Sequence, residues 1–327
     1  TTERRAGPSA TYADPSVFEA VEVARGPGSV AYGSDAFGGV ILMRTRRAEP
    51  GSPFGGRFDG ALGAGAPQQR AALALTKGFS RGGLLVAGHL RELEDWESPR
   101  GTVPNSSASD RGFLARADRV VGGGLLSLGL QSDFARDVGR PRTNSDVVRF
   151  FYPVEDSHRL TAGWERGVAG PFSRVGVSGF LGRYRLVTDQ DRAATSTAPR
   201  SVERASVSAG DFHLRGFAQR PVGRARLEAG VDLNGRSDLE ALEIRERYDD
   251  EGALASREQI VAIESARRVD TGVYASVDSP VGRALAVAGG LRGDVVQNRN
   301  RGGWFGDLER SSGAVSGFAA LTAGPLA

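Results

Sequence analysis

Aromatic and arginine residues occur together in several long polar segments of this 327-residue chain. The densest group runs from Arg140 to Tyr152. Aromatic rings can stack on a flat ligand, and guanidinium groups bind anions through charge-assisted hydrogen bonds. The same residue types also pack loops together or mark a membrane interface. The candidate ligand contacts are Trp96, Arg140, Arg142, Arg149, Phe150, Phe151, Tyr152, Tyr248, Trp304 and Phe305.

Other residues that could bind a metal or take part in catalysis are scattered along the sequence. The acidic groups at 189–191 and 249–251 offer the oxygen ligands that Ca²⁺ prefers, but they lack the spacing of a calcium loop and fit solvated loop tips better. The three histidines, His89, His158 and His213, have no paired metal-ligand spacing. No nucleophile, base and acid stand together in the sequence. We therefore expect no catalytic residues, no metal site and no cofactor.

The composition narrows the class of protein. The chain has 42 basic and 39 acidic residues, interspersed along its length, which argues against a nucleic-acid-binding patch. It has no Cys, so disulfides and Cys-based metal sites are excluded. No apolar run is long enough for a membrane helix, whereas a membrane-spanning β-barrel needs only alternating strands.

Apolar and polar residues alternate from about residue 54 to the end of the chain. In 269–278, for example, the odd positions are Val, Thr, Val, Ala and Val, and the even positions include Asp270 and Asp278. The alternating stretches reach ten or more residues, which is long for a soluble sheet and suits a tilted membrane-spanning strand. The pattern predicts an all-β chain, an antiparallel transmembrane β-barrel rather than a soluble β-solenoid.

Short Gly- and Pro-containing turns alternate with long polar segments, apart from one short loop at 67–69. This alternation is typical of outer-membrane barrels, which have tight turns on one side of the membrane and long loops on the other. In the strand at 204–219 the apolar parity changes, which predicts a β-bulge near Gly210. About twelve strands are expected, at 54–65, 68–79, 82–94, 111–120, 124–137, 155–167, 172–189, 204–219, 224–239, 263–278, 283–298 and 312–322.

The first fifty residues follow a different pattern, with short strands predicted at 21–23 and 40–46 around a Gly-rich stretch. Residues 21–41 read VEVARGPGSVAYGSDAFGGVI. This segment resembles the end of the plug domain of TonB-dependent outer-membrane receptors, and it meets nearly every fixed position of that family's pattern. The motif residues are Glu22, Arg25, Gly26, Pro27, Tyr32, Gly33, Gly38 and Gly39.

The resemblance implies a fold and a function. It implies a 22-stranded barrel closed by a plug, which actively imports a scarce ligand such as a ferric siderophore or cobalamin across the outer membrane of a Gram-negative bacterium. The implied partners are the TonB energy-transducing complex, the ligand and outer-membrane lipid, with no nucleic acid. The expected domains are the C-terminal part of a plug at 1–47, a linker at 48–53 and a partial barrel at 54–327. Glu22 and Arg25 are expected to pair with charges on the barrel wall and to hold the plug.

Geometry predicts that this chain is a fragment. Twelve strands would close a barrel roughly 24 Å across, with about 14 Å of lumen, which is too narrow for a folded plug. Part of the plug, its TonB-contacting segment and the last strands of the barrel are therefore expected to be missing. The alternative interpretations are a passive or adhesive outer-membrane barrel and an outer-membrane enzyme on a smaller barrel.

Overall fold

The computed structural model describes residues 17–25, 39–64, 67–141, 147–282 and 284–323. Most of these residues lie in antiparallel strands, which form one large sheet and two small strand pairs. None of the described residues belongs to a helix long and apolar enough to span a membrane.

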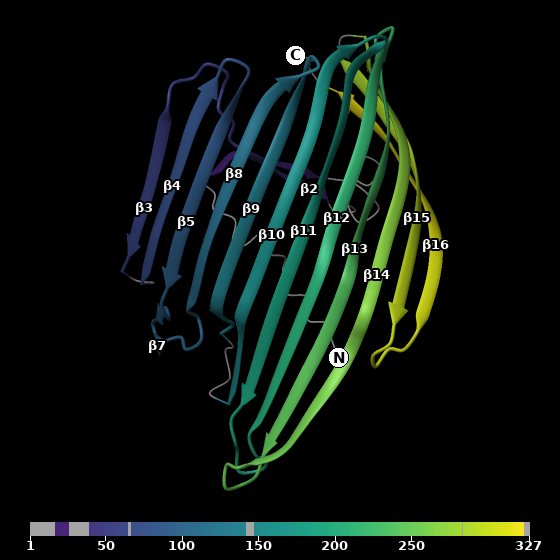
Figure 1. Ribbon diagram of the computed structural model, residues 1–327. Coiled ribbons are helices and arrows are strands. Elements are labelled where there is room, and N and C mark those ends of the chain that lie inside the picture. Colours follow the sequence, from purple (N-terminus) through teal and green to yellow (C-terminus); the bar gives the residue numbers. More distant parts are fainter. Residues whose placement is uncertain (1–16, 26–38, 65–66, 142–146, 283, 324–327) are drawn as a thin grey trace.

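The large sheet is a twelve-stranded antiparallel meander, as the alternation predicts, and it is strongly curved (Figure 1). Each strand pairs with the next one along the chain, except that β5 pairs with β8 because β6 (Glu97–Ser98) and β7 (Gly101–Thr102) form a small pair within the intervening loop. The twelve strands are β3 (Gly55–Gly63), β4 (Gln68–Phe79), β5 (Gly82–Leu93), β8 (Ala108–Val121), β9 (Gly124–Gly139), β10 (Val148–Ala169), β11 (Phe172–Arg192), β12 (Ser201–Val222), β13 (Ala225–Tyr248), β14 (Leu254–Val281), β15 (Leu285–Arg301) and β16 (Leu308–Ala323).

The two ends of the sheet differ in their connections. At one end, called the turn end, tight turns place glycines at positive φ, among them Gly122 at 60°, Gly170 at 61° and Gly223 at 60°. Glycine favours these turns because it has no Cβ to clash in this conformation. The loops at the opposite end, called the loop end, include the β5–β8 and β15–β16 connections. The predicted order of turns and loops is confirmed, although most connections at the loop end are shorter than expected.

Several strands extend farther toward the loop end than the sequence pattern indicates. Figure 1 shows β12, β13 and β14 reaching farthest at that end. The segment 240–262, expected as a loop, is mostly strand, with only the short connection 249–253 between β13 and β14. Likewise, residues 149–152 and Tyr248 lie on strands rather than in loops. These strand extensions carry polar residues on both faces, so they lack the apolar and polar alternation that marks the membrane-spanning part.

The register of β12 corrects the predicted bulge. Relative to β11, β12 pairs without interruption from Ser201 to Gln219. The register shift beside Gly210 occurs against β13, which carries an extra residue near Asp238, a residue at φ 50°. The bulge is therefore in the neighbouring strand, and the change of apolar parity in β12 arises because Val207 and Ala209 face inward while Phe212 and Leu214 face outward.

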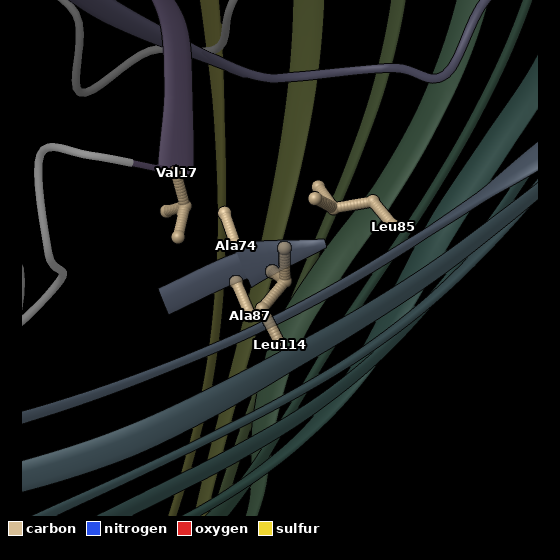
Figure 2. Packing of buried hydrophobic residues seen from close by; sticks show 5 residues of the cluster. All are labelled: Val17, Ala74, Leu85, Ala87 and Leu114. Atoms are coloured by element: carbon tan, nitrogen blue, oxygen red, sulfur yellow. The ribbon is translucent and has the colours of Figure 1, made fainter. Parts of the chain in front are cut away.

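A second, smaller structure lies against one face of the sheet. The two short strands predicted in the first fifty residues are present as β1 (Phe18–Arg25) and β2 (Gly39–Thr45), and they pair antiparallel. Beside them Val17 joins a buried cluster with Ala74, Leu85, Ala87 and Leu114 of the sheet (Figure 2), and Phe18 packs against it. We call this face of the sheet the inner face, and the opposite face, where many large apolar side chains are exposed, the outer face.

The segment from Ala48 to Ser52 joins the small structure to the sheet and is docked on the inner face. Gly78 of β4 and Gly83 of β5 stand directly opposite each other, and their missing side chains leave room for it. The Gly51 N–H donates to the Phe79 carbonyl at 2.9 Å, and Ala48 is buried. The linker therefore rests on backbone rather than on side chains.

Candidate ligand site

A groove of about 830 Å³ runs along the inner face of the sheet from β10 to β16, near the loop end. Strands β12 to β15 supply most of its wall, and the β15–β16 loop supplies the exposed Phe305 at its rim. Alternation along each strand turns every second side chain toward the groove, so its lining comes from residues far apart in the sequence. Its charged and aromatic lining residues include Arg159, Phe180, Asp211, His213, Arg236, Arg267, Arg268, Asp270, Arg292, Asp294, Arg299 and Phe305.

The charges of the groove are only partly compensated. Arg236 donates to Asp211 at 2.7 Å and Arg268 donates to Asp270 at 2.8 Å, each within or between adjacent strands. Arg159 also lines the groove and has no ion-pair partner among the described residues. Arg267 and Arg299 border the groove as well, but they stand opposite each other at positions that alternate with Arg268 and Asn298, so their side chains belong to the outer face. The groove therefore has one cationic group available for an anionic ligand.

Arg292 is the centre of a buried ion network in the wall of the groove. Its guanidinium holds Asp232 of β13 through two bonds of 2.6 and 2.7 Å, and its Nε donates to Asp294 at 2.8 Å. The side chain is 1% exposed, and both carboxylates are nearly as buried. Gly272 makes this packing possible, because a Cβ there would overlap the guanidinium. The network fixes the wall of the groove across β13, β14 and β15.

Aromatic rings supply the flat surfaces of the groove. Phe180 of β11 stacks on His213 of β12 with ring centroids 5.9 Å apart and planes 21° apart. The Arg159 guanidinium lies 4.9 Å from the Phe180 ring centroid. Together with Phe305 at the rim, these rings offer surfaces for a conjugated ligand.

The densest sequence-predicted cluster is divided between the two faces of β10. Arg140 donates to the Tyr152 hydroxyl at 2.6 Å and lies over the rings of both Tyr152 and Phe150, which are buried. The Arg149 guanidinium instead lies 4.5 Å from the ring centroid of Phe151, which stands between Phe150 and Tyr152 in the strand. Alternate residues of a strand point to opposite faces, so these five side chains do not form one surface.

The remaining predicted contacts are also separate. Trp96 and Trp304 are exposed in different loops, and Tyr248 at the end of β13 lies beneath Arg200, 4.8 Å from its guanidinium. Arg142 lies outside the described residues. Among the described candidates, only Phe305 lines the groove.

Three residues of the acidic groups, Asp189, Asp191 and Asp249, have partners within the chain. Asp189 accepts two bonds from Arg204 at 2.7 and 2.6 Å, and Asp191 is paired with Arg200 at 2.8 Å. Both stand on β11 rather than at a loop tip. Asp249 accepts the backbone N–H of Ala253 at 2.7 Å and closes the β13–β14 turn.

The motif of residues 21–41 is described only in part. Glu22 of β1 pairs with Arg44 of β2 at 3.1 Å, so its ion pair is within the β1–β2 pair rather than with the sheet. The contact with the sheet comes from Arg116 of β8, which donates to the Thr45 hydroxyl at 2.7 Å. Arg25 ends β1 and Gly39 begins β2. The Arg25 side chain and the motif residues Gly26, Pro27, Tyr32, Gly33 and Gly38 lie outside the described residues.

Sequence reasoning missed the strand residues of the groove. The alternating pattern indicates that His213 faces inward. It does not show which residues of other strands lie beside His213 in the sheet. The register does this, for example by placing Asp232 and Arg292, 60 residues apart, in one buried network.

The loop between β5 and β8 is organised by one carboxylate. Asp95 accepts the backbone N–H groups of Ser106 at 2.7 Å, Ser107 at 2.8 Å and Asn105 at 3.3 Å. Desolvation raises the pKa of Asp95, but these hydrogen bonds outweigh it and hold the pKa below its ordinary value. A lowered pKa means that the stabilisation is present above the unfolded-state pKa of about 3.9 and is lost as the pH falls through the folded pKa.

We expect Asp95→Asn to open this loop at neutral pH, because the neutral amide is a weaker acceptor for three backbone donors. Hydrogen exchange of the Asn105, Ser106 and Ser107 amides should rise at least about tenfold, since a loss equal to one hydrogen bond to a charged acceptor already costs about 1.5 kcal/mol. Wild-type protein should show the same rise only below about pH 4. Glu97→Gln is the matched control, because among the described residues Glu97 accepts a hydrogen bond only from the Thr102 hydroxyl of its own strand pair. Equal exchange in both variants would contradict the role of Asp95.

Comparison with known proteins gives a consistent picture. No known family profile matches the chain. The vitamin B12 transporter BtuB of Vibrio vulnificus (strain CMCP6) is 41% identical over 83 residues, which is 25% of this chain and 13% of that protein. The copper transporter OprC superposes with a TM-score of 0.75 at 16% identity, over 95% of this chain and 50% of that chain.

Two other solved structures are similar. The unliganded ferric citrate transporter FecA has a TM-score of 0.65 at 15% identity, over 95% of this chain and 47% of its own. The FrpB iron transporter of Neisseria meningitidis (F5-1 variant) has a TM-score of 0.66 at 14% identity, over 96% of this chain and 50% of its own. The chain thus spans about half the length of these solved structures, and the curved sheet corresponds to part of a barrel wall.

The matched proteins named above are transporters, and none is named as an enzyme. The superpositions establish the fold of a TonB-dependent receptor, and the 83-residue match adds local sequence similarity to one. Over the described residues the chain thus has the fold of part of a TonB-dependent receptor of the Gram-negative outer membrane, and the 83-residue match and the motif at residues 21–41 resemble the sequences of such receptors.

Proposed function

We propose that the protein imports a scarce metal chelate across the outer membrane, with the TonB complex supplying the energy through a segment other than the described residues. In this proposal residues 1–47 belong to a plug domain, 48–53 form its linker and 54–327 form part of the barrel wall. The observation that carries the proposal is the arrangement of the inner face. It holds a ligand-sized groove near the loop end and, against the same face, the β1–β2 pair.

The groove favours an anionic chelate such as a ferric siderophore. Arg159 is a cation of the groove without an ion-pair partner among the described residues, and guanidinium groups pair well with carboxylate and catecholate oxygens. Phe180, His213 and Phe305 could stack on a conjugated ligand. A second candidate is cobalamin, which the 83-residue match to a vitamin B12 transporter favours.

Binding measurements on the whole protein in detergent separate the two ligands. We expect an anionic ferric catecholate chelate to bind more tightly than neutral cyanocobalamin, and Arg159→Gln to weaken binding of the chelate at least threefold. Phe305→Ala should weaken binding about three- to tenfold, because a stacked ring contributes about 0.5–1.5 kcal/mol beyond its area. Trp304→Ala is the matched control, since this neighbour is exposed and does not line the groove.

The energised step is tested in cells. Uptake of the bound chelate should require TonB, whereas binding to the cell surface should not. Equal uptake without TonB would overturn the proposal in favour of a passive barrel, and binding without any uptake would favour an adhesive one. Tighter binding of cyanocobalamin would reject the anionic chelate and leave energised transport intact.

A further inference from the structure

The outer face of the sheet changes from apolar to polar, with arginine the commonest residue, at one height on four neighbouring strands. On β11 the outward positions from Ser173 to Leu181 precede Arg183 and Arg185. Eight residues at ~3.3 Å each span about 26 Å along a strand, or roughly 20 Å across a membrane at a tilt of ~40°. This is close to the ~25 Å of a barrel's apolar belt. Arg183 and Arg185 therefore stand where the belt ends, on the loop side.

The register places other outward side chains at the same border. One continuous cross-strand row runs from Arg111 of β8 through Phe134 of β9 and Asp156 of β10 to Arg185 of β11. In the adjacent row Arg183 lies opposite His158. Directly on the membrane side, the next row consists of exposed leucines, Leu130 at 43%, Leu160 at 53% and Leu181 at 63% exposure.

The border carries more positive than negative charge. Asp156 is held by Arg136, which with Arg111 also lies 5.9 Å from the centroid of the Phe134 ring. Arg111, Arg183 and Arg185 are exposed and have no ion-pair partner in the part of the chain that the structure describes. Three arginines without acidic partners, above a row of leucines, match a molecule that is anionic at one end and apolar at the other.

We propose that Arg111, Arg183 and Arg185 bind the phosphate groups of a lipid in the outer leaflet, with its acyl chains against Leu130, Leu160 and Leu181. Guanidinium groups bind phosphate oxygens with two parallel hydrogen bonds, and basic clusters beside a membrane attract anionic headgroups. The site is on the opposite face of the sheet from the ligand groove, so it does not depend on the proposed transport function. A lipid rather than a free anion is the expected occupant because the arginines adjoin the apolar belt directly.

The test measures lipid retained by the whole protein in detergent, using native mass spectrometry with added bisphosphorylated lipid A. Arg111→Gln, Arg183→Gln and Arg185→Gln together should lower retention at least tenfold. The control, Arg119→Gln with Arg166→Gln, removes two exposed outward arginines at the turn end and should leave retention unchanged. Heat-dependent mobility in gels checks that every variant is folded.

Each comparison decides the proposal. It is supported if the triple variant loses the lipid, lipid A without phosphates binds at least tenfold more weakly, and inorganic phosphate at millimolar concentration does not displace the bound lipid. Unchanged retention in the triple variant, or equal binding of the dephosphorylated lipid, would overturn it. Displacement by inorganic phosphate would overturn the assignment to a lipid and indicate a free-anion site.

Discussion

Replacement of Arg292 by methionine is expected to destabilise the protein by about 3–5 kcal/mol, because it leaves buried carboxylates without their counter-charge. Asp232 and Asp294 are 6% and 3% exposed, and Arg292 donates to both of them. In the variant these two groups would face each other across β14 without compensation. Urea unfolding in phospholipid vesicles, followed by tryptophan fluorescence, measures the loss.

A matched variant distinguishes the effect of burial on stability from the effect of losing an ion pair alone. Arg226 pairs with Asp278 at 2.9 Å, also between adjacent strands, but their side chains are 61% and 48% exposed. Solvent screens such pairs, which typically contribute about 0–1 kcal/mol. Arg226→Met should therefore change stability by less than about 1 kcal/mol.

A rescue tests the mechanism directly. When Asp232→Asn and Asp294→Asn are added to Arg292→Met, the buried negative charges disappear and most of the lost stability should return. If Arg292→Met costs no more than Arg226→Met, the network is not buried as the structure has it. If the triple variant stays as unstable as the single one, lost packing rather than uncompensated charge is the cause.

The membrane-spanning part of the fold was predictable because lipid acts on every second residue. In the paired segments of β9 and β10 that run from Leu126 opposite Trp164 to Leu130 opposite Leu160, for example, the outward positions are apolar. Tight turns interrupt this pattern. The number of strands in the large sheet and the order of turns and loops were correct for this reason. Extended strands beyond the membrane were missed, since water lies on both of their faces. In β13 the pairing of Arg245 with Glu243 stabilises a polar strand that alternation cannot distinguish from a loop.

The candidate site was predictable only at its edge. Aromatic residues near arginines mark Phe305, but the same signal marks Phe150 and Tyr152, which pack with Arg140 instead. The wall of the groove depends on the register and on the extra residue near Asp238, which together set which side chains meet. These quantities arise from pairing between strands and are not contained in any single segment of the sequence.

Gly83→Val is expected to lift the linker off the inner face and expose it to protease. A Cβ at Gly83 would lie 2.5 Å from the Ala48 carbonyl oxygen and 2.6 Å from its Cβ, so the linker cannot stay in place. Overpacking of this kind costs about 1–3 kcal/mol, and each 1.4 kcal/mol raises the open population about tenfold. Trypsin cleavage after Arg47, next to the buried Ala48, should therefore be at least about fivefold faster, because proteolysis follows the population of the open form.

Two further variants make the result specific. Gly78→Ala should have the same effect by a different contact, since its Cβ would overlap the Glu49 carbonyl oxygen and the Ser52 nitrogen. Gly88→Ala is the control on the same strand as Gly83, but its Cβ would meet only a carbonyl oxygen at 3.5 Å, an ordinary contact. If cleavage after Arg47 is equally fast in all of them and in wild type, the linker is not held by the two glycines. If only the two inner-face variants are cut faster, the absence of two side chains is what docks the linker, and loosening it becomes a way to separate linker release from ligand binding in uptake measurements.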